Sequence, residues 1–274
     1  MKADIDLMEV NGYTIYVEKH FKKENKKTAI MVNGALSTTT SFRNCVKHLG
    51  NSLNFILFDL PFTGGSKKHN EGSYILTKEE EVSILLFLIE HYRPHFLVSV
   101  SWGGYAALMA LAHQPPSIEK AAIASFATHL NGPMKEYLLR AKHLADDKKF
   151  EDVAILMNNE VGKYLPRIIK YINKKHISTL DQREYNQAYF HINQVLEAGT
   201  VDYSDIWSNI NTPVVFINGE KDEHTPPSSA RRLENSISSC EFKVIKEAGH
   251  FLDIENRVAH NNLMSTLREV FAIA

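Results

Sequence analysis

The sequence predicts an α/β protein with a doubly wound, mostly parallel sheet and a helical cap inserted into it. Two observations predict this architecture. Short apolar runs recur along the chain, and each is followed by a turn and a helical stretch, which is the order of elements in doubly wound sheets. Residues 130–203 break this alternation, because they contain helical patterns but no strand-like run.

The composition is that of an ordinary globular protein. Of the 274 residues, 44% are apolar and 23% are charged, and 31 basic side chains nearly balance 32 acidic ones. This argues against a disordered chain. It also argues against a nucleic-acid-binding protein, which usually carries a basic excess.

The sequence gives no sign of export or membrane insertion. The longest nearly continuous apolar run covers residues 82–89, far short of the ~20 residues that cross a bilayer. Asp4 and Asp6 stand where a signal peptide would be basic and then apolar. Cys45 and Cys240 are isolated, which fits a reducing compartment. We therefore expect a cytoplasmic protein without a transmembrane segment.

The chain begins with a predicted hairpin, because two alternating runs, 5–10 and 13–17, flank the strong turn pair Asn11-Gly12. A lysine-rich loop, 19–27, follows. Six bounded apolar runs suit strands buried on both faces of a parallel sheet. They are residues 28–32, 54–58, 96–100, 121–124, 214–217 and 242–245.

Helices are predicted between these runs. Thr77 and Glu80 have the spacing of a capping box and open a helix that reaches His91. Further helices are expected over 103–113 and 256–271. Residues 130–203 are too long for a plain loop, so we expect a cap over the carboxyl edge of the sheet, where such folds bind ligands. Residues 1–129 and 204–274 would then form the core.

The first candidate for chemistry lies in residues 96–104, FLVSVSWGG. A strand run ends at Ser101 and a helix starts at once, which is the setting of a nucleophile elbow. The first glycine of the usual G-x-S-x-G pattern is Ser99 here. A buried serine at an ordinary strand–helix turn is the alternative.

An acid and a histidine follow later strands. Asp222 lies three residues after Gly219, where an apolar run ends, and His250 comes just after the last strand run. Glu223 competes with Asp222. The order Ser101, Asp222, His250 is that of the α/β hydrolases, in which histidine deprotonates the serine and the acid orients the histidine.

The loop after the first buried strand, NGALS at 33–37, is expected to supply one amide of an oxyanion hole. By position the two donors would be the backbone amides of Ala35 and Trp102. Asn33 stands where many α/β hydrolases have histidine.

We expect Asp59 and Ser66 to brace a nearby turn, with a catalytic role as the less favoured alternative. The sequence contains neither G-x-G-x-x-G nor a P-loop pattern.

Several segments resemble a narrower family, the acyltransferases that make 3-(3-hydroxyalkanoyloxy)alkanoic acids, the lipid precursors of rhamnolipids. The cap segments VGKYLP (161–166) and FHINQVL (190–196) and the Ser99 elbow carry this resemblance, together with residues 32–35, 39–42, 58–62 and 249–253. The 3-hydroxyacyl carrier-protein to coenzyme A transacylases are similar too and remain an alternative.

The resemblance implies a reaction without a metal or redox cofactor. Its substrate would be an (R)-3-hydroxyacyl group on acyl carrier protein or coenzyme A, and Ser101 would carry the acyl group before the 3-hydroxyl of a second unit accepts it. A plain esterase or thioesterase would use the same three residues with water. A non-catalytic binding protein is the third alternative, and the intact serine, acid and histidine argue against it.

We expect the cap to line the acyl pocket, together with Leu36, through apolar residues Leu165, Ile169 and Ile172. Packing of the cap onto the sheet is an equally good explanation for any one of them.

A basic stripe on the cap is a candidate dock for the acidic carrier protein, with a solvated helix face as the alternative. Its residues are Lys163, Arg167, Lys170 and Lys174.

Overall fold

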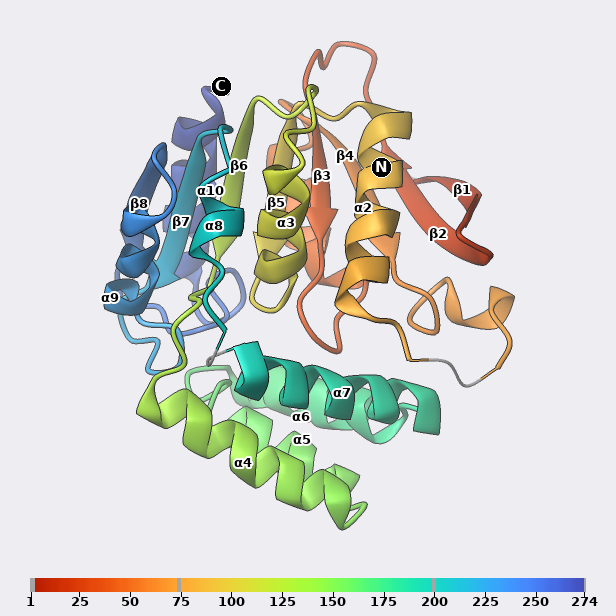
Figure 1. Ribbon diagram of the computed structural model, residues 1–274, viewed down its shortest axis with the longest axis vertical. Helices are drawn as coiled ribbons and strands as arrows, with labels where there is room; N and C mark the ends of the chain where they lie inside the picture. The colour runs from red at the N-terminus through yellow and green to blue at the C-terminus, as the bar shows by residue number, and fades with distance from the viewer. Residues whose placement is uncertain (1–2, 73–74, 199–200, 274) are drawn as a thin grey trace.

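The computed structural model describes residues 3–72, 75–198 and 201–273. Its centre is an eight-stranded sheet in the order β1-β2-β4-β3-β5-β6-β7-β8. β1 and β2 pair with antiparallel neighbours, and the remaining strands run parallel. Figure 1 shows the helices on both faces of this sheet, as the alternation of elements predicts.

The strands fall where the apolar runs predict them, with ends one or a few residues longer. Strand β2 extends to His20 and takes Lys19 from the lysine-rich loop. The strands are β1 (Asp4–Val10), β2 (Tyr13–His20), β3 (Thr28–Val32), β4 (Asn54–Asp59), β5 (Phe96–Val100), β6 (Lys120–Ala124), β7 (Val214–Gly219) and β8 (Cys240–Ile245).

The core helices cover the two faces of the sheet. The capping box at Thr77 and Glu80 is formed, and the helix that it opens ends at Tyr92. The first helix is absent from the sequence-based prediction, because its seven residues are too few to show a clear helical period. These helices are α1 (Arg43–Leu49), α2 (Lys78–Tyr92), α3 (Gly103–Ala112), α8 (Ser204–Trp207), α9 (Pro227–Ala230) and α10 (Arg257–Phe271), with 3-10 turns η1 (Thr39–Phe42), η2 (Lys67–His69) and η3 (Arg231–Asn235).

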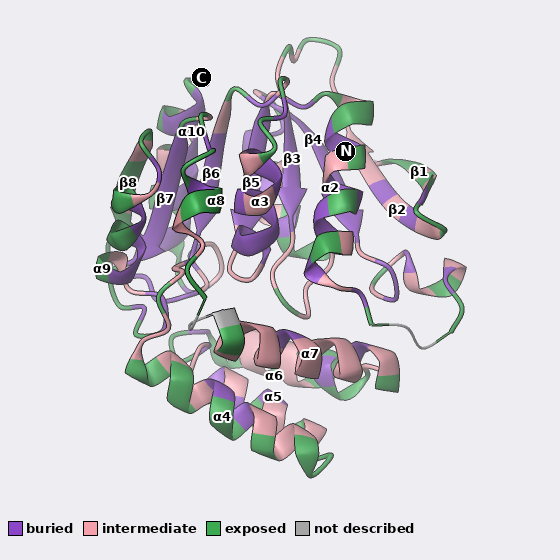
Figure 2. Ribbon diagram, viewed as in Figure 1, coloured by how far each residue is buried: buried purple, intermediate pink, exposed green. Residues whose placement is uncertain are grey.

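Two apolar layers form the core, one on each face of the sheet. Helices α2 and α3 pack on one face, and α1 and α10 pack on the other. Every residue of β4 and β7 is buried, which is why these strands read as continuous apolar runs. The central strands are purple in Figure 2.

After β6 the chain leaves the sheet and forms a layer of helices across the carboxyl edge of the sheet (Figure 1). They are α4 (Gly132–Asp146), α5 (Phe150–Asn159), α6 (Arg167–Ser178) and α7 (Gln182–Ala198). We call α4 to α7 the cap. That residues 130–203 form a unit of their own stays a prediction. Within the described residues, no helix is long and apolar enough to span a bilayer.

Candidate active site

Ser101 occupies a strained turn between β5 and α3. Its φ of 51° is left-handed, which costs a residue with a Cβ on the order of 1 kcal/mol or more. The Ser101 amide donates to the Ala124 carbonyl at 2.8 Å and its carbonyl accepts from the Gly104 amide at 2.8 Å. A Cβ on Gly103 would lie 2.4 Å from the Asn33 carbonyl oxygen. The glycine therefore lets the oxyanion loop approach the nucleophile closely.

The structure brings the three predicted side chains together. His250 Nε2 lies 3.0 Å from Ser101 Oγ, and His250 Nδ1 lies 2.8 Å from Asp222 Oδ2. These are hydrogen-bond distances on both sides of the imidazole. The competing acid, Glu223, instead pairs with Lys163 at 2.8 Å on the surface. The nucleophile, base and orienting acid that acyl transfer needs are thus in contact.

The Asp222–His250 pair has the electrostatics of an orienting acid and a base. Burial disfavours the charged form of each residue, but the attraction between them outweighs it. The pKa of Asp222 is held well below its usual value, and the pKa of His250 is raised above 6.5. Thr225 Oγ1 also donates to Asp222 Oδ2 at 2.6 Å. Asp222 therefore stays ionised beside His250 and favours the protonated form of the imidazole.

Glu255 holds the histidine loop. Its buried carboxylate accepts from the Gly249 amide at 2.6 Å and from the Phe251 amide at 2.9 Å, the two residues on either side of His250. Ser125 Oγ donates to the His250 carbonyl at 2.6 Å. Glu255 was not among the residues that the sequence predicts for the site. The only signal was an acid five residues after the histidine, which by itself does not distinguish a buried clamp from a surface acid.

The two predicted oxyanion donors lie on neighbouring segments. Ala35 follows β3 and Trp102 opens the turn into α3, and within the described residues no hydrogen bond uses either amide. Asn33 fixes the first loop by donating its side-chain amide to the Phe58 carbonyl at 3.0 Å. Both amides therefore remain available to a ligand beside Ser101.

Asp59 and Ser66 brace the turn after β4. The Asp59 carboxylate accepts from the Thr39 amide at 2.7 Å and from the Gly65 amide at 2.8 Å. Ser66 Oγ donates to the Asp59 carbonyl at 2.7 Å. Burial raises the pKa of Asp59 to about 6. These bonds tie η1 to the β4 loop, beneath the wall of the candidate pocket.

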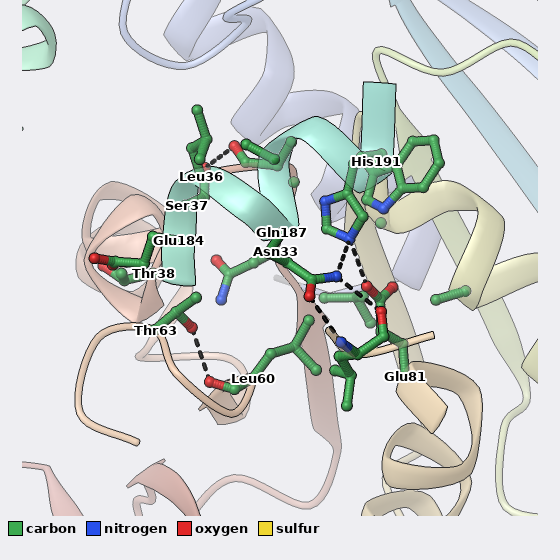
Figure 3. A pocket seen from close by; sticks show the side chains of 18 of the residues that line it. Asn33, Leu36, Ser37, Thr38, Leu60, Thr63, Glu81, Glu184, Gln187 and His191 are labelled. Carbon is green, nitrogen blue, oxygen red and sulfur yellow. Dashed lines mark hydrogen bonds and ion pairs between the residues drawn. The ribbon is translucent and has the colours of Figure 1, made fainter. Parts of the chain in front are cut away.

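A narrow cavity extends from the oxyanion loop, between the core and the cap (Figure 3). Its walls come from the loops after β3 and β4, from α2 and α3, from the end of α6 and from the first part of α7. Most of its lining is apolar, as an acyl group requires. The apolar residues include Val32, Ala35, Leu36, Phe58, Leu60, Pro61, Leu76, Leu85, Ala106, Leu180 and Ala188.

Leu36 lines this cavity, but the three expected cap residues do not. Leu165 is buried within the cap against Gly162, Ile169 is half-buried outside the cavity, and Ile172 is 51% exposed. The prediction that they line the pocket is wrong for this cavity. The apolar stripe of α6 is real, but part of it faces solvent, and the cavity meets α6 only near its C-terminal end at His176.

The basic stripe is only partly free. Lys163 pairs with Glu223, and Lys174 pairs with Glu151 at 2.5 Å. Lys170 Nζ donates to the Lys163 carbonyl at 3.0 Å. Arg167 is exposed, and the described residues show no ion pair to it.

The described residues also contain no group of three or more side chains suited to hold a metal ion.

The family model for the alpha/beta hydrolase fold matches residues 29–256. The chain belongs to the α/β-hydrolase family. It is 42% identical to an (R)-3-hydroxydecanoyl-ACP:CoA transacylase of Pseudomonas putida, over 97% of this chain and 91% of that protein. A transacylase of the same name from Pseudomonas aeruginosa is 39% identical, over 97% and 89% of the two chains.

Solved α/β hydrolases share the fold. The enzyme MGS-M2 from a deep-sea metagenome superposes with a TM-score of 0.77 at 20% identity, covering 97% of each chain. The enol-lactonase from Burkholderia xenovorans superposes with a TM-score of 0.76 at 17% identity, covering 97% of this chain and all of the other.

Proposed function

We propose that this α/β hydrolase is a serine acyltransferase that takes an (R)-3-hydroxyacyl group from an acyl carrier protein or coenzyme A thioester. The contact of Ser101, His250 and Asp222 carries the chemistry. The 39–42% identity to transacylases named for 3-hydroxydecanoyl groups supports the substrate class. The apolar cavity beside the oxyanion loop supports a lipid acyl group.

In the first half-reaction Ser101 Oγ attacks the thioester carbonyl while His250 Nε2 takes its proton. The carbonyl oxygen becomes an oxyanion that accepts from the Ala35 and Trp102 amides, a type of interaction that typically contributes about 10²–10³ in rate per donor. When the intermediate collapses, the C–S bond breaks and His250 protonates the leaving thiolate. The acyl group is then an ester on Ser101.

In the second half-reaction the 3-hydroxyl of another hydroxyacyl unit attacks this ester, with His250 again as the base. The new ester bond forms as the bond to Ser101 breaks, and Ser101 recovers its proton from His250. The product is a 3-(3-hydroxyalkanoyloxy)acyl group that stays on the acceptor's carrier as a thioester. We propose this acceptor because the segments quoted above resemble the enzymes that make rhamnolipid precursors. Such an enzyme would work in the cytoplasm, where both thioesters are made.

The thiol of coenzyme A is the second candidate acceptor, and the names of the transacylase relatives favour it. The same acyl-enzyme would then pass its acyl group to sulfur and yield a 3-hydroxyacyl-CoA. Water would yield the free acid. The three outcomes share the first half-reaction and differ only in the group that reaches the Ser101 ester.

Mass spectrometry of the products separates these acceptors. Purified protein is given 3-hydroxydecanoyl carrier protein, first alone and then with free coenzyme A, and the Ser101→Ala variant serves as the control for uncatalysed transfer. We expect an ester-linked dimer. A product that is only 3-hydroxydecanoyl-CoA identifies the transacylase, and only monomeric acid identifies a hydrolase.

We further propose that the exposed face of α6 docks the carrier protein. Arg167 lies beside three strongly exposed apolar side chains, Ile168, Tyr171 and Ile172, which are 63%, 64% and 51% exposed. Apolar contacts ringed by basic side chains suit a small acidic partner. The end of the same helix reaches the oxyanion loop, where His176 Nε2 lies 3.2 Å from the Leu36 carbonyl.

A further inference from the structure

A cluster of buried polar side chains lies in one wall of the otherwise apolar cavity. Glu81 comes from α2, and Gln187 and His191 come from α7, so that the cluster joins the core to the cap (Figure 3). His191 Nε2 lies 2.8 Å from Glu81 Oε1 and 2.9 Å from Gln187 Nε2. None of these residues takes part in the acyl-transfer steps described above.

Lys78 completes the charge balance of the cluster. It is buried and forms an ion pair with Glu81, and its ammonium lies 4.2 Å from the centre of the Trp102 ring. Burial disfavours the Glu81 carboxylate, but Lys78 and His191 outweigh it and bring the pKa of Glu81 to about 2. Burial lowers the pKa of His191 despite the nearby carboxylate. Burial also lowers the pKa of Lys78, against the attraction of Glu81. The cluster therefore consists of a carboxylate at Glu81, its ion-pair partner Lys78, and an imidazole at His191 whose neutral form is favoured.

Stability alone is a poor explanation for such a cluster. A buried ion pair is often no more stable than apolar side chains of the same volume, because both charges lose their hydration. Buried, perturbed ionisable groups in a cleft are more typical of sites that bind or react with a ligand. A purely structural cluster would act as a tether between cap and core, and it would affect all acyl thioesters alike.

Two polar atoms around the cluster have no partner within the described residues. One is Trp102 Nε1, which is buried. The other is His191 Nδ1, which takes part in no described hydrogen bond and is not among the buried unpartnered atoms. The imidazole thus retains a free polar edge beside the cavity that Figure 3 shows. A ligand hydroxyl can both donate and accept, so it suits either tautomer of this ring.

The cluster shares the cavity with the two residues whose amides are the proposed oxyanion donors. The His191 and Trp102 rings are 5.0 Å apart between centres, and the Trp102 amide is one of the two oxyanion donors. The cavity that His191 and Glu81 line also contains Ala35, the other donor. The hydroxyl of a 3-hydroxyacyl group lies on the second carbon beyond its carbonyl carbon, so an acyl chain that runs from Ser101 into this cavity would carry the hydroxyl close to the loop.

We propose that the free edge of His191, held by Glu81, binds the 3-hydroxyl of the acyl group on Ser101 and selects 3-hydroxyacyl over plain acyl thioesters. This inference rests on the proposed acyltransferase function. A site built to pair with a hydroxyl disfavours the substrate that lacks it, because a buried polar group is then left unpaired. His191 is a specificity residue here, and Glu81 and Lys78 position it.

The test compares the rates at which 3-hydroxydecanoyl-CoA and decanoyl-CoA acylate Ser101, followed by mass spectrometry of the quenched protein. The wild-type protein should prefer the hydroxyacyl thioester at least 10-fold. His191→Phe keeps a ring against Trp102 but removes both nitrogens. It should lower the hydroxyacyl rate at least 10-fold and leave the decanoyl rate within 2-fold. His191→Asn should recover part of the preference, and His113→Phe, on an exposed helix end, is the matched control.

The outcomes are separable. An equal loss with both thioesters, or no loss with either, would mean that the cluster is only a tether and would overturn the proposal. Equal wild-type rates with both thioesters would overturn it as well, whether or not the variants fold, while the acyl-enzyme itself would stand. If neither thioester forms an adduct on Ser101 of the wild-type protein, the proposed function fails together with this inference.

Discussion

The core and the cap differ in how completely their apolar side chains are buried. In the core, β4 and β7 are buried along their whole length, and hydrogen bonds hold Ser101, Asp222 and His250 in place. In the cap, helix α6 has a single buried residue, Ile177. On the same helix, Ile168 and Tyr171 are among the most exposed large apolar residues of the protein. The candidate reacting groups thus lie on the more fully buried part of the fold, and the more exposed cap is the part that we propose selects the substrate.

This division predicts that changes in the core alter the rate of chemistry, and changes in the cap alter which substrate is used. The largest effect should come from Ser101→Ala, which removes the nucleophile from the elbow. Acyl transfer should fall by about 10⁴-fold or more, with little change in thermal stability because the side chain is small and half-exposed. Mass spectrometry for the acyl-enzyme and thermal unfolding check both points. Near wild-type turnover by a folded variant would end the covalent mechanism.

The next largest effect should come from Asp222→Asn. An amide at this position favours the wrong tautomer of His250, a change that costs about 10⁴-fold in triad enzymes. Glu223→Gln is the matched control, because Glu223 carries the same charge one residue away and faces Lys163. The comparison is made on steady-state kcat. A mild Asp222→Asn and a severe Glu223→Gln would reverse the assignment of the acid.

Glu255→Ala should affect both stability and rate. The buried carboxylate accepts from two amides, and leaving two buried donors unpaired costs about 2–5 kcal/mol in total. Because the lost bonds flank His250, kcat should fall while KM for the thioester changes little. Urea unfolding and kinetics measure the two effects. Glu247→Ala, at an exposed acid on the same loop, is the control, and a fully active Glu255→Ala would exclude the positioning role.

Acid should loosen the contact between cap and core. The folded-state pKa of His191 is lowered from 6.5, so the unfolded chain binds its proton first and stability is lost as the pH falls through 6.5. The folded-state pKa of Glu81 is lowered from 4.5 to about 2, so its contribution is present above pH 4.5 and is lost between there and about pH 2. His191→Phe should remove the upper part of this loss. Unfolding free energies from pH 4 to pH 7.5 test it, and identical slopes for variant and wild type would contradict it.

The smallest effect should come from the proposed carrier dock. Arg167→Glu with Lys170→Glu should raise KM for a carrier-protein substrate several-fold and leave kcat nearly unchanged, since rim charges act mainly on association. The effect should fade at high salt and be absent with a small thioester. Lys23→Glu with Lys26→Glu, two exposed residues in the loop before β3, is the control. An equal effect on both substrates would remove the docking role.

The sequence by itself determined the sheet, the elbow and the order of the reacting residues. Buried parallel strands must be apolar on both faces, so runs such as 54–58 and 214–217 are visible in the sequence. The chain must turn sharply after β5, and the turn is visible as Ser101 followed by Trp102 and two glycines. Asp222 and His250 could be assigned because each follows a strand, and the carboxyl ends of parallel strands meet at one edge.

Only the tertiary structure decided which side chains face the cavity, which pack inside the cap and which are exposed to solvent. The apolar stripe of α6 predicts an amphipathic helix, but the period of a helix does not say whether its face meets the cavity, the rest of the cap or solvent. Leu165 and Ile172 were therefore assigned to the wrong surface. The contact between Glu81 and His191 joins residues that are 110 positions apart in the sequence. Glu255 lies near the residues that it contacts, but in a loop without a recognisable motif. Their roles follow from long-range packing, which no local pattern records.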